Sequence, residues 1–473
     1  MVFSSLLFVF AFLTPCLLIY TFIDQKYKNR VLLIFSLVFY AWGGIAFVGI
    51  LVADAAICWI CALQIENSRE RGRRKLFMIL ACIGLLGFLG VFKYLTFFCE
   101  NTHALFHVPK VVPQIALPIG ISFYTFQLLS YVVDVYRGEV KAQRNYFKLL
   151  LYASLFHQCI AGPIVRYSTV ANEIDHRKVN RNDIYYGVRR FCIGLAKKAI
   201  LANGCAGIAD QILEGGTKAL HAQSTLALWL GMFCYMLEIY LDFSAYSDMA
   251  IGMGRMVGFH YLENFNYPYI ASSVQDFWRR WHISLSTFFR DYVYIPLGGN
   301  RCSTGRYVFN MAVVWFLTGM WHGASWNYIL WGLFYLGFLL LERFVIRGRM
   351  RVVPAHIYTL LVVFFGWVLF RFENLKEVGV TLLGLFGIGT ASFGGLEVRT
   401  LFAQNIFFLI FCVIACTPLG KWIKHRLFLL AKRNMPMFYV YEVQETVLPV
   451  AMLVLSVFAL IGNTYNPFLY FQF

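Results

Sequence analysis

The chain has 473 residues, of which 60% are hydrophobic and only 14% are charged, and its formal net charge is +17. A soluble domain is about 45–50% apolar and about 25% charged, so a single water-facing globule is excluded and a polytopic helical membrane protein is predicted. The basic residues lie in short loops between apolar runs, which favours contact with the lipid bilayer and argues against nucleic acid as a partner.

Apolar stretches recur along the whole chain and predict an all-α architecture. The first stretch has no basic flank and no clear cleavage site, so a retained span is expected rather than a removed signal peptide. The 12 cysteines mostly fall inside apolar runs, which indicates packing residues rather than disulfides. The expected helices cover residues 4–23, 31–43 with 45–64, 76–99, 115–136, 186–212, 222–243, 307–321 with 324–342, 354–372, 402–419 and 445–462.

Most lysines and arginines fall into segments 24–30, 65–75, 137–148, 166–198, 255–306, 343–351 and 421–433. The positive-inside rule then places these segments in the cytoplasm and both termini outside it. Residues 149–164 and 307–342 must enter and leave on the cytoplasmic side, and residues 31–64 allow only two short passes. Broken apolar segments survive at membrane depth only around a protein-buried or watery cavity. We therefore expect one domain over 1–473, a ring of transmembrane helices with re-entrant segments around a central tunnel.

Two acidic residues stand at the end of the expected helix 222–243. Glu238 and Asp242 are four residues apart, so they share one helix face. They either pair with nearby arginines to hold the fold together or orient a catalytic imidazole in the tunnel.

An amphipathic helix is expected after Ser272 or Ser273, either of which can cap it, with Asp276 in its first turn. It is too polar to span and should lie at the cytoplasmic interface, where tryptophan and arginine partition well. Pro296, Gly298 and Gly299 break the chain after it.

The same segment carries three arginines and one histidine. Arg279, Arg280 and Arg290 contact either lipid headgroups or the phosphates of an anionic acyl donor. His282 is either a satisfied interface histidine or a second tunnel residue.

His322 is the strongest candidate for chemistry. An ionisable side chain at membrane depth is costly and asks for a function, and imidazole is well suited to proton transfer near neutral pH. The small residues Gly319 and Gly323 are expected to leave room beside the ring. Trp321 and Asn327 flank it and are expected to support the tunnel.

The segment 463–473 ends in NPFLYFQF and is expected to form an extracytoplasmic aromatic tail. Tyr470 belongs either to an interfacial aromatic belt, to a contact with an extracytoplasmic partner, or to the chemistry as an acyl acceptor.

Five stretches together resemble the membrane-bound O-acyltransferase (MBOAT) superfamily, most of all its bacterial alginate and peptidoglycan O-acetyltransferase membrane subunits. They are LPIGISFYTFQLLSYVVDVYRG (117–138), YLDFSAYSDMAIG (240–252), DFWRRWHISLSTFFRDYVYIPLGGNR (276–301), TGMWHGASWNYILWG (318–332) and the terminal FLYFQF. The family's catalytic histidine falls on His322, its second prominent histidine on His282, and its terminal aromatic motif on Phe468, Leu469, Tyr470 and Phe471.

The resemblance implies an O-acetyltransferase of the bacterial cytoplasmic membrane, with no bound cofactor or metal. Acetyl-CoA would be the cytoplasmic donor, and an SGNH-type partner outside would place the acetyl group on an alginate-like or cell-wall polysaccharide. His322 would act as general base for the attacking hydroxyl. The competing hypotheses are D-alanyl transfer to teichoic acid, a transporter without chemistry and a scaffolding subunit.

Overall fold

The computed structural model describes residues 2–106, 115–159, 162–346 and 348–462. Within these ranges the regular structure is helical, apart from one isolated β-bridge between Ser224 and Ser392, so the predicted all-α class is confirmed. The predicted tail 463–473, which includes Tyr470, lies outside the described residues.

Eight helical stretches of the described chain are long and apolar enough to cross a bilayer, as predicted for a multi-pass membrane protein. They are Ile45–Asn67, Arg71–Phe106, Arg181–Leu213, Thr225–Met256, Trp326–Ile346, Val352–Arg371, Leu396–Ala415 and Met435–Gly462.

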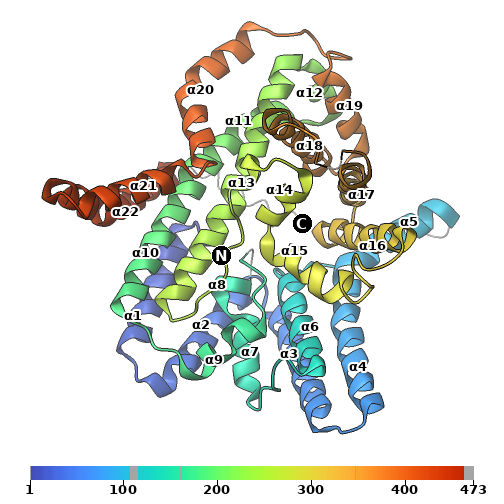
Figure 1. Cartoon of the computed structure of the whole chain (residues 1–473), viewed down its shortest axis with the longest axis vertical. Coiled ribbons are helices and arrows are strands. Elements are labelled where there is room, and N and C mark those ends of the chain that lie inside the picture. The colour runs from blue at the N-terminus through green and yellow to red at the C-terminus, as the bar shows by residue number, and fades with distance from the viewer. Residues whose placement is uncertain (1, 107–114, 160–161, 347, 463–473) are drawn as a thin grey trace. The chain divides into compact units, whose positions relative to one another are not determined.

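The chain divides into two compact units, whose helices are labelled in Figure 1. The first comprises residues 1–191, 247–263 and 287–296, and the second comprises 192–246, 264–286 and 297–473. The first unit contains α1 (Thr14–Phe22), α2 (Lys28–Ala41), α3 (Ile45–Asn67), α4 (Arg71–Leu89), α5 (Leu95–Phe106), α6 (Ile121–Arg137), α7 (Tyr146–Ser154), α8 (Phe156–Cys159) and α9 (Tyr167–His176).

Three helices cross the boundary between the two units along the chain, namely α10 (Arg181–Ala196), α13 (Thr225–Met256) and α15 (Ile283–Phe289). The second unit also holds α11 (Asn203–Leu213), α12 (Gly216–Ala222), α14 (Val274–Arg280), α16 (Thr304–His322), α17 (Trp326–Leu341), α18 (Val352–Arg371), α19 (Leu375–Leu385), α20 (Leu396–Ala415), α21 (Leu419–Ala431) and α22 (Met435–Gly462).

In the first unit α6 packs against α3, α4, α7 and α9 and is buried along most of its length. Near the end of α9, His260 Nδ1 lies 2.7 Å from a Glu173 carboxylate oxygen and its Nε2 lies 3.2 Å from Asp183 Oδ1. Partial burial opposes protonation, but the two carboxylates outweigh it and raise the pKa of His260.

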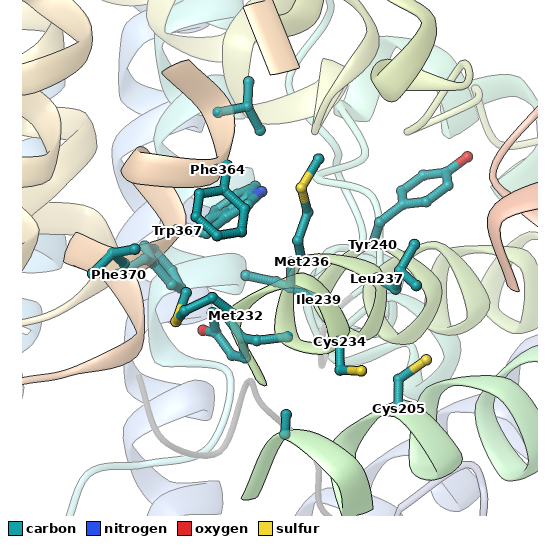
Figure 2. Packing of buried hydrophobic residues seen from close by; sticks show 14 of the residues in the cluster. Cys205, Met232, Cys234, Met236, Leu237, Ile239, Tyr240, Phe364, Trp367 and Phe370 are labelled. Atoms are coloured by element: carbon teal, nitrogen blue, oxygen red, sulfur yellow. The ribbon is translucent and has the colours of Figure 1, made fainter. Parts of the chain in front are cut away.

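In the second unit the core forms where α18 meets α13 and α14. Figure 2 shows Phe364, Trp367 and Phe370 of α18 together with Met232 and Met236 of α13. Large aromatic rings dominate this core, and close-packed rings of this kind leave little freedom for the side chains to rearrange.

Two expectations about helix length are wrong. Residues 31–64 do not form two short passes, because α3 runs for 23 residues and is long enough to span. Residues 273–290 do not form one helix either. They divide into α14, α15 and the π-helical turn η6 (Arg290–Tyr294), and the break falls at His282, whose φ is +44°.

Other local predictions are confirmed. Ser273 caps α14, because its hydroxyl accepts a hydrogen bond of 3.0 Å from the Asp276 backbone N–H. Gly298 and Gly299 have φ of +112° and +58° in the turn after η6. Residues 149–159 form only the short helices α7 and α8, neither of which could span, while α16 and α17 pack as a hairpin with His322 at the junction.

Candidate active site

His322 is the last residue of α16 and lies among aromatic rings of the second unit. Its side chain is buried, and its ring centroid lies 4.9 Å from that of Trp321, 4.9 Å from Trp331 and 5.1 Å from Phe370. All three rings meet the imidazole nearly edge-on, at interplanar angles of 79° to 83°. Such a setting fixes the orientation of the imidazole.

The glycines near His322 allow close packing of α16 and α17. A Cβ atom on Gly319 would lie 2.4 Å from the Tyr328 carbonyl oxygen, and one on Gly323 would lie 2.2 Å from the Tyr328 ring. A Cβ on Gly332 would lie 2.3 Å from the Trp315 carbonyl oxygen. These glycines therefore let α16 and α17 approach each other closely, and room beside the imidazole stays a prediction.

His282 lies between α14 and α15 and is also buried in the second unit. Its ring stands edge-on to Phe243 at 4.7 Å and to Trp321 at 5.5 Å between centroids. Trp321 therefore contacts both candidate histidines, as expected for a supporting residue.

Hydrogen bonds to one asparagine fix the tautomer of His282. Asn264 Oδ1 accepts from the backbone N–H of Ser284 at 3.2 Å and from its hydroxyl at 2.9 Å, so this atom is the amide oxygen. It lies 3.2 Å from His282 Nδ1, which therefore carries a proton and donates it. Nε2 then keeps its lone pair, and no hydrogen-bond partner for it exists within the described residues. Burial lowers the pKa of His282 to about 3, so the ring is neutral near physiological pH.

The predicted acidic pair lies on α13, where both carboxylates lie close to basic side chains. Asp242 forms an ion pair with Lys198 in which Nζ and Oδ1 are 2.9 Å apart, and both side chains are only 2% exposed. Glu238 is buried one turn earlier and interacts with the opposite charges of Arg371 and Lys198. These contacts favour the structural alternative, with a lysine as the main partner of Asp242 instead of an arginine.

The three predicted donor-binding arginines have different surroundings. Arg279 is exposed on α14. Arg280 Nε lies 3.0 Å from both carboxylate oxygens of Asp276, one helical turn earlier, so much of its charge is already neutralised. Arg290 belongs to the first unit and binds both oxygens of its neighbour Asp291.

Asn327 is buried near the start of α17, and its side-chain amide donates to the Leu369 carbonyl oxygen at 3.3 Å. It joins α17 to α18 and thereby fixes the helix that carries Trp331. Tyr470, the acyl-acceptor candidate, lies outside the described residues.

Sequence reasoning missed three residues that define this region: Lys198, Asn264 and Phe370. Lys198 stands in a basic run and was read only as a topology signal. Asn264 and Phe370 reach the histidines from distant parts of the chain, and neither carries a local signal. The pairing of Arg280 with Asp276 was readable from their spacing of four residues.

Comparison with known proteins adds a family and relatives. The family model "MBOAT, membrane-bound O-acyltransferase family" matches residues 139–378. The probable alginate O-acetylase AlgI of Azotobacter vinelandii is 37% identical, and the alignment covers 100% of both chains. The peptidoglycan O-acetyltransferase of Helicobacter pylori is 33% identical over 83% of this chain and 81% of its own. The teichoic acid D-alanyltransferase of Bacillus subtilis is 29% identical over 46% of this chain and 56% of its own.

Proposed function

The chain belongs to the membrane-bound O-acyltransferase family, as its motifs predicted, and from this premise we propose that it transfers acetyl groups from acetyl-CoA to an extracytoplasmic polysaccharide. It would act in the bacterial cytoplasmic membrane and need no resident cofactor or metal. The full-length similarity to an alginate O-acetylase carries the proposal, since the similarity to a D-alanyltransferase covers less than half of the chain. The relative that acts on peptidoglycan supports a polysaccharide acceptor in general.

In the proposed reaction His322 is the general base. An acceptor hydroxyl attacks the thioester carbonyl carbon while its proton moves to the imidazole. The C–S bond then breaks, and the proton passes from the imidazole to the departing thiolate, so the free imidazole is restored. The step requires a neutral imidazole held in one orientation, and the three aromatic rings around His322 provide that orientation.

We assign His282 a second role in the same reaction. Its Nδ1–H is held by Asn264, so Nε2 presents a lone pair that can accept a hydrogen bond from the acceptor hydroxyl or from the donor. The left-handed backbone and the hydrogen bonds fix the ring without a charged partner. This arrangement suits a positioning residue whose protonation state does not change during turnover.

Acetate-labelled acetyl-CoA and purified protein in detergent test the proposal. We expect thioester cleavage by the wild type and no cleavage by His322→Gln, which keeps bulk but removes basicity. His221→Gln is a matched control, because His221 is exposed and its Nδ1 only contacts the Gly389 carbonyl oxygen. Full activity of the His322 variant would refute the general-base role.

The route of the acetyl group outside the membrane is a separate proposal. Tyr470 is a candidate acceptor that would hand the group to an SGNH-type partner, and the alternative is direct transfer to a residue of that partner. Tyr470→Phe removes only the hydroxyl, so it should abolish label on the protein and acetylation of the polymer. Normal acetylation by this variant would reject Tyr470 as carrier.

A further inference from the structure

Asp54 places a carboxylate inside the first unit, in the middle part of α3, which is long and apolar enough to span a bilayer. At the rise of an α-helix it lies about 14 Å from the start of α3 and about 20 Å from its end. Its side chain is completely buried. An ionisable group at membrane depth is costly, so it asks for a partner that offsets its charge.

No basic side chain among the described residues offsets this charge. The groups that interact with Asp54 electrostatically are Tyr40, Cys58 and Tyr124, and none of them carries a positive charge. Neither carboxylate oxygen accepts a hydrogen bond from a described residue. A carboxylate that stays charged in such a place needs a cation that the chain does not supply.

Two tyrosine hydroxyls from neighbouring helices converge beside the carboxylate. Tyr40 comes from α2 and Tyr124 from α6, and both helices pack against α3. The two phenol rings lie 6.1 Å apart between centroids, at an interplanar angle of 78°. Both side chains are buried and interact electrostatically with Asp54.

These hydroxyls have no partner of their own. They lie near each other, yet neither completes a hydrogen bond within the part of the chain that the structure describes. Together with the two carboxylate oxygens of Asp54 they make four oxygen atoms from three helices. Folded proteins rarely bury so many unsatisfied polar atoms in one place, so a bound species must supply the missing interactions.

The chemistry of the four oxygen atoms selects that species. Carboxylate and hydroxyl oxygens are hard ligands, which suit alkali and alkaline-earth cations. One carboxylate balances one positive charge, whereas a divalent cation would leave an uncompensated charge in the interior. Cys58 follows Asp54 by one helical turn, but among the described residues no three His, Cys, Asp or Glu side chains converge as a transition metal requires.

We propose that Asp54, Tyr40 and Tyr124 bind a small monovalent metal cation in the interior of the first unit. The carboxylate supplies the compensating charge, and the two hydroxyl oxygens supply neutral ligands. The cation ties α2, α3 and α6 together, so the site stabilises the fold. The inference does not rest on the proposed acyl transfer.

Thermal unfolding of the full chain in detergent tests the site, with sodium as the probe. Sodium chloride and choline chloride are compared at one total concentration, so that screening is equal and only the cation differs. The unfolding midpoint of the wild type should be about 2 °C or more higher in sodium, and the effect should saturate as the sodium concentration rises. Asp54→Asn keeps the shape of the side chain and removes its charge, so its midpoint should be the same in both salts.

Equilibrium dialysis with radioactive sodium measures binding directly. One ion should be retained per wild-type chain, and Asp54→Asn should retain none. This measurement separates a metal cation from a proton, because a proton on Asp54 would leave no sodium bound.

Two tyrosine variants separate loss of a ligand from general damage to the fold. Tyr124→Phe removes one neutral ligand and should raise the sodium concentration of half-maximal stabilisation about tenfold. Tyr131→Phe is the matched control on the same helix, because the Tyr131 hydroxyl already accepts from the Gln143 backbone N–H at 2.9 Å. It should lower the midpoint equally in both salts and leave the sodium effect unchanged.

Two results would overturn the site. A sodium effect of equal size in the wild type and in Asp54→Asn would mean that sodium acts elsewhere on the protein. Equal wild-type midpoints in the two salts, with no sodium retained in dialysis, would mean that a proton neutralises Asp54. Neither result would affect the proposed acetyl transfer, which thioester cleavage tests separately.

Discussion

Gly332→Ala should separate the two helices that enclose His322. The new Cβ would lie 2.3 Å from the Trp315 carbonyl oxygen, about 1 Å short of an ordinary van der Waals contact. The obstacle is backbone, so a side-chain rotation cannot relieve it. Overpacking of this kind costs about 1–3 kcal/mol.

The displacement should affect catalysis more than folding. Trp331 precedes Gly332 and lies 4.9 Å from His322 between ring centroids, so a shift of α17 moves one wall of the imidazole site. A misplacement of about 1 Å can reduce a rate about 100-fold. We therefore expect a lower midpoint of thermal unfolding in detergent and a loss of acetyl-CoA cleavage of that order.

Gly337→Ala is the matched control on α17, because a Cβ there would meet nothing within 4 Å. Alanine is the better helix former by up to about 1 kcal/mol, so this variant should be as stable as wild type or slightly more so. Equal stability and equal activity of the two alanine variants would refute the packing argument.

Three other substitutions have defined outcomes. Lys198→Met leaves the Asp242 carboxylate buried without its ion-pair partner and should lower the free energy of unfolding by about 3–5 kcal/mol. Adding Asp242→Asn should recover part of this loss, and a double variant that recovers nothing would contradict the pairing. Asn264→Ala removes the acceptor of His282 Nδ1 and should lower kcat, while the shape of its pH profile between about pH 5 and 8 should match that of the wild type, since the His282 ring titrates far below that range. The pKa of His260 is raised in the folded protein, so its interactions stabilise the fold fully below about pH 6.5 and are lost as the pH rises through the raised pKa. His260→Gln should lack this loss of stability at higher pH, which thermal unfolding measured at several pH values would show.

The parts of the fold that depend on local pattern were predictable. Apolar runs gave the positions of the long helices, and the expected stretches 307–321 and 324–342 placed the junction of α16 and α17 near His322. Ser273 was readable as a cap because its effect is confined to the next three residues.

The break at His282 was not predictable, because the pattern of Trp, Arg and Phe continues through it. Its cause is non-local: Asn264 bonds to the backbone of Ile283 and Ser284 and to the ring of His282, and it lies well before them in the chain. The buried ion pair of Lys198 with Asp242 was not predictable either. A lysine within a basic stretch of sequence gives the same pattern whether its side chain contacts lipid headgroups or a buried carboxylate.

The left-handed backbone at His282 restricts how this position can change over evolutionary time. A side chain with a Cβ pays a steric penalty of about 1–2 kcal/mol in that region, which only glycine avoids and asparagine or aspartate tolerate well. None of these three offers an aromatic nitrogen lone pair, so every sterically easy replacement forfeits the chemistry. Substitutions at His282 should therefore abolish acetylation before they reduce the amount of folded protein.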